Sequence, residues 1–136
     1  MAKILVIDDE KLIRDFLGTL LRQQGYDVVL AESGGMGLEL FCQERPDLVV
    51  TDIYMPEKDG IEVILEMKKG ESNTKIIAMS GGGRGRLDWR TFALSLGADR
   101  ALVKPFEPTT FLVAIQEVLT ASADTTVAVL PSSMPE

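Results

Sequence analysis

The amino-acid sequence predicts an α/β protein in which helices cover both faces of a parallel β-sheet. Two observations indicate this fold class. Short apolar runs alternate five times with segments whose apolar residues recur three or four positions apart. The chain is also long enough, at 136 residues, to form one domain with a hydrophobic core. Alternation of strands and helices at this spacing requires crossover connections, which make the strands parallel.

Five short apolar runs are predicted to form the strands. Each is rich in Val, Ile, Leu or Ala and is followed by a charged or turn-forming residue. The third begins as the continuous run Leu48-Val49-Val50, and Met55-Pro56 breaks it because proline cannot continue a strand ladder. The predicted strands are residues 3–7, 27–31, 48–51, 75–80 and 100–103.

Five segments with apolar residues at helical spacing are predicted to form the helices. Ser33 is suited to cap the second helix, and Pro108 is suited to the first turn of the fifth. The predicted helices are residues 12–21, 36–44, 60–69, 87–96 and a segment from 108 to 119. Their larger apolar side chains are expected to lie in the core, among them Phe16, Met36, Met67, Phe92 and Phe111.

Right-handed crossovers leave few ways to order five parallel strands. The pattern fits the flavodoxin-like (βα)5 fold, which is doubly wound around a five-stranded parallel sheet of order 2-1-3-4-5. In that order the first and third strands are neighbours, and ligands bind in the crevice outside their carboxyl ends. We therefore expect Asp8, Asp9 and Asp52, which follow those two strands, to lie around one crevice.

Composition and charge exclude several classes of site. The chain has 21 acidic and 14 basic residues, a formal net charge of -7, so no direct binding of nucleic acid through a basic face is expected. It contains no histidine and one cysteine, which excludes a Cys/His zinc site, a Ser-His-Asp triad and an intrachain disulfide. Cys42 lies in a helical pattern and is expected to be a buried, reduced thiol.

The sequence has no pattern typical of a membrane span or an export signal. Acidic residues cut short the apolar run at residues 4–7, and no other run approaches the length of a span. We therefore expect a cytoplasmic protein without a membrane partner. Residues 1–120 are expected to form the domain, and residues 121–136, which have few charges, are expected to be a mostly disordered tail.

Polar groups follow or end four of the predicted strands at the same edge of the sheet. Asp8 and Asp9 follow the first strand, Asp52 the third and Lys104 the fifth, and Ser80 ends the fourth. Carboxylates that converge without a counter-charge repel each other, and a hard divalent cation such as Mg²⁺ relieves this through oxygen ligands. The ammonium group of Lys104 adds a positive charge suited to phosphate oxygens.

These groups are the parts of a phosphoryl-transfer site. Asp52 is the candidate nucleophile, Lys104 and Ser80 are candidate partners of the phosphoryl oxygens, and Gly81 offers a backbone N–H that no side chain shields. Two plainer interpretations stay open at this point. Asp52 could cap the turn that follows it, as aspartate often does, or the acids could form a structural cluster paired with Lys104.

Five motifs of the sequence, in this order, resemble the receiver domain of two-component response regulators. They are Ile7-Asp8-Asp9-Glu10, Thr51-Asp52-Ile53-Tyr54-Met55-Pro56, Asp59-Gly60, Met79-Ser80-Gly81 and Lys104-Pro105-Phe106. The resemblance covers about residues 3–120. It implies a single-domain, chemotaxis-regulator-like switch that accepts a phosphoryl group from a sensor histidine kinase or a histidine phosphotransfer protein. Such a protein catalyses its own phosphorylation and dephosphorylation but is not an enzyme acting on a metabolite.

The resemblance also implies a role for each matching residue. It makes Asp52 the phospho-acceptor and, with Asp9 and the main-chain carbonyl of Tyr54, a direct Mg²⁺ ligand, whereas Asp8 acts through a metal-bound water. It implies that Ser80 hydrogen-bonds the phosphoryl group, that Lys104 pairs with it, and that the peptide bond between Lys104 and Pro105 is cis. A downstream protein partner is expected on the face formed by the fourth helix, fifth strand and fifth helix.

Two features depart from the usual receiver pattern. Receivers usually carry Tyr or Phe three residues before the lysine as a rotameric switch, but this chain has Ala101 there. Trp89 or Phe92 in the fourth helix could replace that ring, although a core position is the simpler interpretation for Phe92. The loop at residues 81–86 is unusually glycine-rich. It lacks a nucleotide-binding fingerprint, and we interpret it as a mobile loop that can close over a phosphoryl group at Asp52.

Tyr54 lies two residues beyond Asp52, where a bulky ring could hinder an attacking water molecule.

Three alternatives to a terminal switch remain. The absence of an aromatic ring at Ala101 favours a phosphorelay shuttle, because a carrier needs less output switching. The chain could also be a receiver fragment of a longer regulator. A haloacid-dehalogenase-type hydrolase would require a second Asp at the position of Tyr54.

Overall fold

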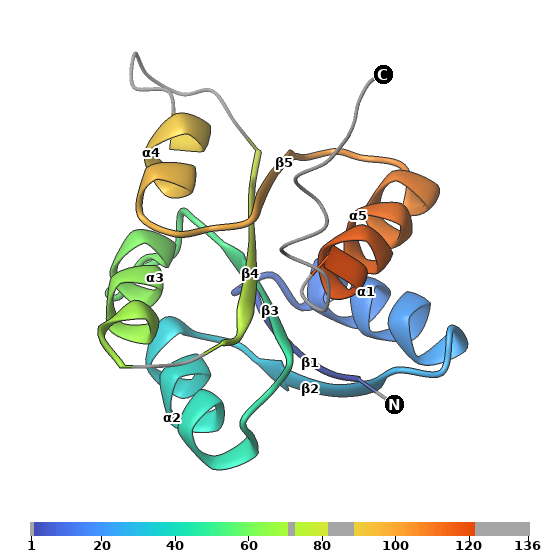
Figure 1. Ribbon diagram of the computed structural model, residues 1–136, viewed down its shortest axis with the longest axis horizontal. Coiled ribbons are helices and arrows are strands. Elements are labelled where there is room, and N and C mark those ends of the chain that lie inside the picture. Colours follow the sequence, from blue (N-terminus) through green and yellow to red (C-terminus); the bar gives the residue numbers. More distant parts are fainter. Residues whose placement is uncertain (1, 71–72, 82–88, 122–136) are drawn as a thin grey trace.

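The sheet has five parallel strands in the predicted order. The computed structural model describes residues 2–70, 73–81 and 89–121. The strands are arranged in the order β2-β1-β3-β4-β5, so the prediction of a flavodoxin-like α/β fold is confirmed (Figure 1). Their bounds are Lys3–Ile7 for β1, Asp27–Ala31 for β2, Leu48–Asp52 for β3, Lys75–Ser80 for β4 and Arg100–Val103 for β5.

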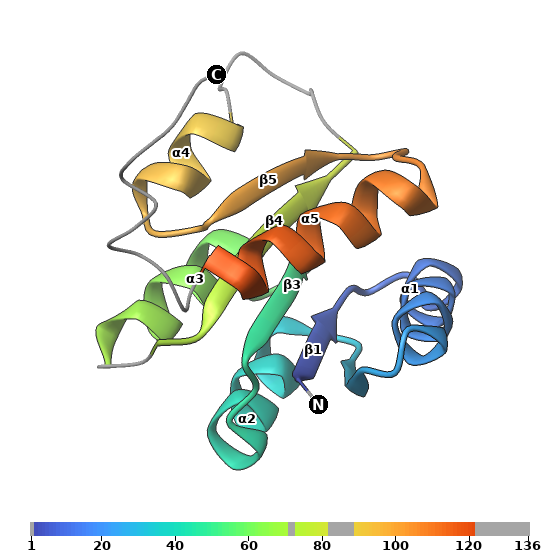
Figure 2. The ribbon, with the colours of Figure 1, turned by 45° about the vertical axis from the view of Figure 1, so that its right-hand side comes forward.

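The helices form a layer on each face of the sheet. In Figures 1 and 2, α1 and α5 lie together on one face, and α2, α3 and α4 lie on the other. The helix bounds are Lys11–Gln23 for α1, Gly34–Glu44 for α2, Gly60–Lys69 for α3, Trp89–Ser95 for α4 and Pro108–Ala121 for α5.

Each face of the sheet has its own hydrophobic core, because successive strand residues point to opposite faces. Ile4 and Val6 of β1 pack in the core beneath α1 and α5. Leu5 and Ile7 of the same strand pack in the core beneath α2, α3 and α4. All four side chains are fully buried, which explains why the sequence of β1 is a continuous apolar run.

Local signals fix the helix ends, and the predictions for Ser33 and Pro108 are confirmed. The Ser33 hydroxyl accepts a hydrogen bond from the Met36 amide at the start of α2. Asp59 and Glu62 form a reciprocal capping box at the start of α3. Gly97, which follows α4, has φ of 120°, a conformation that residues with a side chain rarely adopt.

The sequence was a poorer guide to which helix side chains are buried. Met67 and Phe111 lie in the core as predicted, but Phe16 and Met36 are exposed, so that prediction was wrong. In α4 the prediction for Phe92 was also wrong, because its side chain is 47% exposed and Trp89 is the buried aromatic residue at 5%. Cys42 is an exposed free thiol, not a buried one.

Some expectations concern residues that lie outside the described ranges. They are the mobile loop at residues 82–86, the first two residues of the predicted fourth helix and the tail from residue 122 to 136. The boundary of the domain at residue 120 therefore stays a prediction. Among the helices that the structure describes, none is long and apolar enough to cross a membrane.

Candidate functional site

Acidic side chains from two neighbouring strands meet at the carboxyl edge of the sheet. β1 and β3 pair in parallel with Ile7 opposite Thr51, so the residues that follow them emerge side by side. Carboxylate oxygens of Asp8, Asp9 and Asp52 lie within 4.8 Å of one another. The predicted acidic crevice between the first and third strands is therefore present.

A polar cavity of about 430 Å³ opens above these acids. Its walls come from the ends of β1, β3, β4 and β5, which is the arrangement expected where parallel strands end at one edge. The lining includes every predicted site residue except Asp8, and it adds Glu10. The lining residues are Asp9, Glu10, Asp52, Tyr54, Ser80, Gly81 and Lys104.

Asp8 lies beneath the cavity with no exposed surface, and both of its carboxylate oxygens accept hydrogen bonds. Oδ1 accepts from the Glu10 amide at 2.9 Å, and Oδ2 accepts from the Lys104 ammonium at 3.0 Å. The Arg14 guanidinium donates to the main-chain carbonyl of Asp8 at 2.8 Å. These three contacts fix the turn between β1 and α1 from which Asp9 reaches the cavity.

Lys104 supplies the positive charge at the centre of the cluster. Its Nζ lies 3.0 Å from Asp8 Oδ2 and 3.6 Å from Asp52 Oδ1. The Lys104 amide donates to the Ser80 carbonyl at 2.7 Å, and the bond to Pro105 is cis, as the resemblance implied. Burial lowers the pKa of Lys104, but the hydrogen bond to Asp8 and the negative charges nearby outweigh it, so the pKa lies above its usual value.

Asp52 is the acid whose ionisation is most disturbed. Burial raises its pKa to about 6, and the negative charges of Asp8 and Asp9 act in the same direction. Lys104 and the Ile53 amide, which donates to Asp52 Oδ1 at 3.0 Å, oppose the rise without cancelling it. Burial is therefore the main reason why the Asp52 carboxylate is disfavoured. The cluster also places three carboxyl groups beside one lysine, so it carries a negative charge when the acids are ionised.

The residues present fit a hard divalent cation. The donors are all oxygens, they are close enough to share one ion, and they carry the uncompensated charge that such an ion would balance. Asp8 already uses both oxygens to accept hydrogen bonds, which suits contact through a water molecule better than direct ligation. Asp9 is exposed at the cavity wall, and Tyr54 lines the same cavity.

The two described residues at the end of β4 lie where the sequence predicts. Ser80 is buried and lines the cavity, and Gly81 beside it is exposed. Sequence reasoning missed two contributors, Glu10 in the cavity wall and Arg14 beneath it. Glu10 directly follows the two aspartates, so its place in the sequence offered a signal. No sequence pattern shows that the Arg14 side chain turns back to the Asp8 carbonyl.

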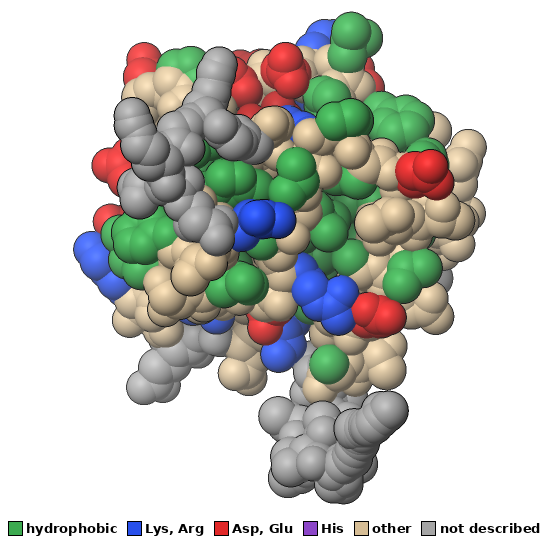
Figure 3. Space-filling model, turned by 90° about the horizontal axis from the view of Figure 1, so that it is seen from above, with side chains coloured by type: hydrophobic (Ala, Val, Ile, Leu, Met, Phe, Trp, Pro, Cys, Tyr) green, Lys and Arg blue, Asp and Glu red, His purple; other side chains and the backbone are tan. Residues whose placement is uncertain are grey.

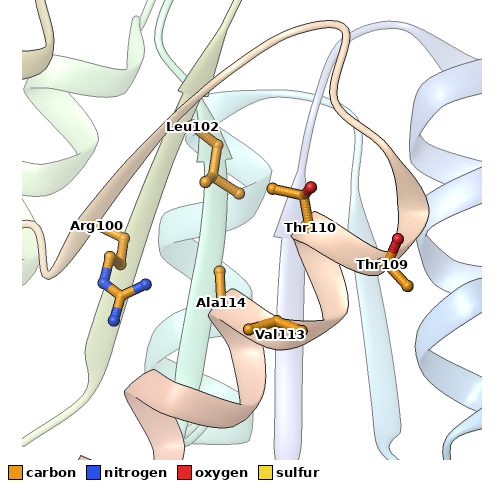
Figure 4. A pocket seen from close by; sticks show the side chains of 6 residues that line it. All are labelled: Arg100, Leu102, Thr109, Thr110, Val113 and Ala114. Atoms are coloured by element: carbon orange, nitrogen blue, oxygen red, sulfur yellow. The ribbon is translucent and has the colours of Figure 1, made fainter.

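A second groove of about 370 Å³ lies between β5 and α5, away from the acids. Figure 4 shows Leu102 of β5 and Ala114 of α5 pointing into this space, with Arg100 at one side. Val103 of β5 and Val113 of α5 are exposed hydrophobic residues of the same two elements, and Phe92 of α4 is exposed as well. Figure 3 shows hydrophobic side chains spread across this side of the molecule, with charged side chains between them.

The sequence matches the response regulator receiver domain family over residues 4–116. This chain belongs to that family. The solved structure of a CheY-like receiver domain protein from Methanospirillum hungatei is 30% identical and has a TM-score of 0.85, with 92% of this chain and 98% of that one covered. A receiver domain from Clostridium thermocellum is 34% identical, with a TM-score of 0.83 and coverage of 90% and 98%.

Longer regulators contain the same domain. A protein from Guillardia theta named probable transcriptional regulator ycf27 is 44% identical over 117 residues, which are 86% of this chain and 45% of that protein. The regulatory protein AtoC of Escherichia coli is 35% identical over 117 residues, 25% of its length. The chain thus spans less than half of these relatives. It is a response regulator receiver domain of two-component systems.

Proposed function

We propose that this receiver accepts a phosphoryl group on Asp52 from the phosphohistidine of a sensor histidine kinase or a histidine phosphotransfer protein. The observation that carries the proposal is the position of Asp52. Its carboxylate is nearly buried at the floor of an open cavity, within reach of two other acids and 3.6 Å from Lys104. A structural turn cap would not need this gathering of charge.

The proposed reaction is a displacement at phosphorus. A carboxylate oxygen of Asp52 forms a bond to phosphorus as the bond between phosphorus and the donor's imidazole nitrogen breaks. The electron pair of the broken bond stays on the imidazole, which takes a proton from solvent. Lys104, Ser80 and the Gly81 N–H would contact the oxygens of the transferred group, and the fact that all three residues line the cavity with Asp52 supports this role.

Mg²⁺ would be held by Asp9, Asp52 and the main-chain carbonyl of Tyr54, with Asp8 acting through a water molecule. The ion would supply positive charge that offsets the repulsion between the carboxylates and the incoming phosphoryl oxygens. The same set of residues would support hydrolysis of the acyl phosphate. We therefore regard the protein as a switch that catalyses its own phosphorylation and dephosphorylation, not as an enzyme with a metabolite substrate.

The output surface is proposed to be the face of α4, β5 and α5. It combines the groove between β5 and α5 with the exposed Phe92, Val103 and Val113, which a protein partner could cover. Ser80 ends β4 and Lys104 directly follows β5. A new phosphoryl charge near these two residues would therefore favour one of two conformations of the strand ends and of the face beside them. The relatives named transcriptional regulators are longer, so a DNA-binding segment outside this chain is compatible with the proposal.

A phosphorelay shuttle is the second candidate, and Ala101 favours it. This residue is half-buried in β5 and has no ring that could alternate between two positions. Trp89 of α4 is buried in the hydrophobic core against which Ala101 packs, so it is a candidate to couple β5 to α4. Transfer of the phosphoryl group from Asp52 to a histidine phosphotransfer protein would distinguish the shuttle from a terminal switch.

A phosphoryl mimic tests the site without knowledge of the kinase. Beryllium fluoride should bind the protein in the presence of Mg²⁺ and change the fluorescence of Trp89, the single tryptophan of the chain. Asp52→Asn should abolish the change, and Lys104→Met should weaken it. A fluorescence change of equal size in Asp52→Asn would show that the mimic binds elsewhere and would refute the assignment of Asp52.

A further inference from the structure

Gly60 allows α3 to begin directly against the end of β3. A Cβ placed on Gly60 would lie 2.2 Å from the Asp52 carbonyl oxygen and 2.7 Å from Ile53 Cα. Both are backbone atoms, which cannot rotate away as the end of a side chain can. The Gly60 amide donates to the Ile53 carbonyl at 2.8 Å, so helix and strand end are held together by the contact that the missing side chain permits.

Gly34, the first residue of α2, makes a similar approach from another direction. A Cβ there would lie 2.4 Å from the carbonyl oxygen of Lys58 and 3.0 Å from Val63 Cγ2. Neither Gly34 nor Gly60 has a positive φ, so the need for glycine is steric at both positions. Residues 53–59 form the loop between β3 and α3. The first residue of α3 packs closely against the start of this loop, and the first residue of α2 packs closely against its end.

This loop connects the glycine contacts to the cavity. The Ile53 amide donates to Asp52 Oδ1 at 3.0 Å, and the carbonyl of the same residue is held by Gly60. Tyr54 is the next residue, and it lines the cavity. A displacement of the loop would therefore move both the donor to Asp52 and the main chain of Tyr54.

We propose that Gly34 and Gly60 are positioning residues of the cation site. By allowing α2 and α3 to approach the loop closely, they hold the Ile53 amide and the Tyr54 carbonyl at fixed positions relative to Asp52. The inference rests on the proposed function, because it concerns the residues that would hold Mg²⁺. It assigns a role in that site to α2, a helix that contributes no side chain to the cavity.

The test compares Mg²⁺ affinity in Gly34→Ala and Gly60→Ala, measured by titration calorimetry of metal-free protein at a temperature where circular dichroism shows each variant folded. The expected result is a loss of about tenfold or more, the range seen when residues that support metal ligands are changed. Gly35→Ala is the matched control, because a Cβ there meets nothing within 4 Å and lies on the same helix. It should bind like the wild type.

A second control separates positioning from stability. Val118→Ala removes buried carbons near the end of α5 that is far from Lys104, so it should lower stability and leave Mg²⁺ affinity unchanged. In metal-free Gly34→Ala, the amide resonances of Ile53 and Tyr54 should also shift, a readout that needs no ion. If Gly60→Ala does not fold, the Mg²⁺ affinity and the amide resonances of Gly34→Ala together test the proposal.

The outcomes separate this inference from the proposed function. Failure of the wild type to bind Mg²⁺ would refute the proposed cation site itself. Binding in the wild type and equally tight binding in both glycine variants would overturn only the role of the glycines. A loss in Val118→Ala as large as in the glycine variants would also overturn it, because the effect would then follow stability.

Discussion

The two edges of the sheet use acidic residues in opposite ways. At the amino edge, acids are matched one by one: Asp47 accepts from the Lys3 amide at 2.8 Å, Asp99 accepts from the Ile76 amide at 2.9 Å, and Glu44 pairs with the Lys3 side chain at 2.9 Å. At the carboxyl edge, three acids gather around Lys104, and the pKa of Asp52 rises to about 6. Acids at the first edge stabilise the fold, whereas burial and, to a lesser extent, neighbouring acids disfavour the ionised form of Asp52 at the second, a cost that a bound cation can offset.

The largest expected effect is a change in the free energy of unfolding when Asp52, at the carboxyl edge, is replaced. Asp52→Asn should raise the free energy of unfolding of the metal-free protein at pH 7 by about 1–3 kcal/mol, because it removes an ionised group that burial and Asp8 disfavour. Since the pKa of Asp52 is raised on folding, this penalty appears as pH rises from about 4 to about 6 and is complete above that. Urea unfolding at pH 7 and pH 4 measures the gain, which should vanish at the lower pH.

Mg²⁺ affinity should fall as the pH is lowered through about 6. Below about pH 6 Asp52 takes up a proton, so its carboxylate no longer serves as a ligand. Between pH 7 and pH 5 the dissociation constant should rise about tenfold for one competing proton. Calorimetric titration at several pH values is the measurement, and a constant affinity from pH 7 to pH 5 would contradict the raised pKa of Asp52.

At the amino edge the sign of the effect should reverse. Asp99→Ala should lower the free energy of unfolding by about 1 kcal/mol, because the Ile76 amide loses its acceptor. Asp99→Asn keeps an acceptor oxygen and should cost less. Neither change should alter Mg²⁺ affinity. If Asp99→Ala were more stable than the wild type, the claim that acids at the amino edge stabilise the fold would be wrong.

The smallest expected effect concerns the rim of the cavity. Tyr54 is about half exposed and lines the cavity beside Asp52, and we propose that its ring hinders a water molecule approaching Asp52. Tyr54→Asn should speed the loss of the phosphoryl group by about three- to tenfold, which corresponds to about 1 kcal/mol of barrier. The decay of the phosphorylated protein, followed by intact mass, measures this rate, and equal rates would rule out shielding.

The strands could be predicted because each is a short apolar run, and the position of the site followed from the order of those strands. Parallel strands bring their carboxyl ends to one edge, so Asp8, Asp52 and Lys104 had to converge once the strand order was fixed. Burial on the helices was harder to predict. Helical spacing shows which residues share a stripe, but it does not show how far neighbouring elements cover that stripe, so Phe16 and Phe92 were placed in the core although they are exposed.

Other features depend on contacts that no local pattern encodes. The bond from Arg14 to the Asp8 carbonyl and the approach of Gly34 to Lys58 both join separate elements. They become visible only when the helices are placed on the sheet. By propensity alone, a glycine in a helix is expected only to destabilise it. The structure shows why Gly34 and Gly60 accept no side chain, because a Cβ at either position would collide with a backbone oxygen atom.

The central claim is that the excess charge at the carboxyl edge serves phosphorylation of Asp52. The most direct measurement is intact-mass spectrometry after incubation with acetyl phosphate and Mg²⁺, beside Asp52→Asn and a metal-free sample. We predict the gain of one phosphoryl group that requires both Asp52 and Mg²⁺. No gain in the folded wild-type protein, or an equal gain in Asp52→Asn, would contradict the claim.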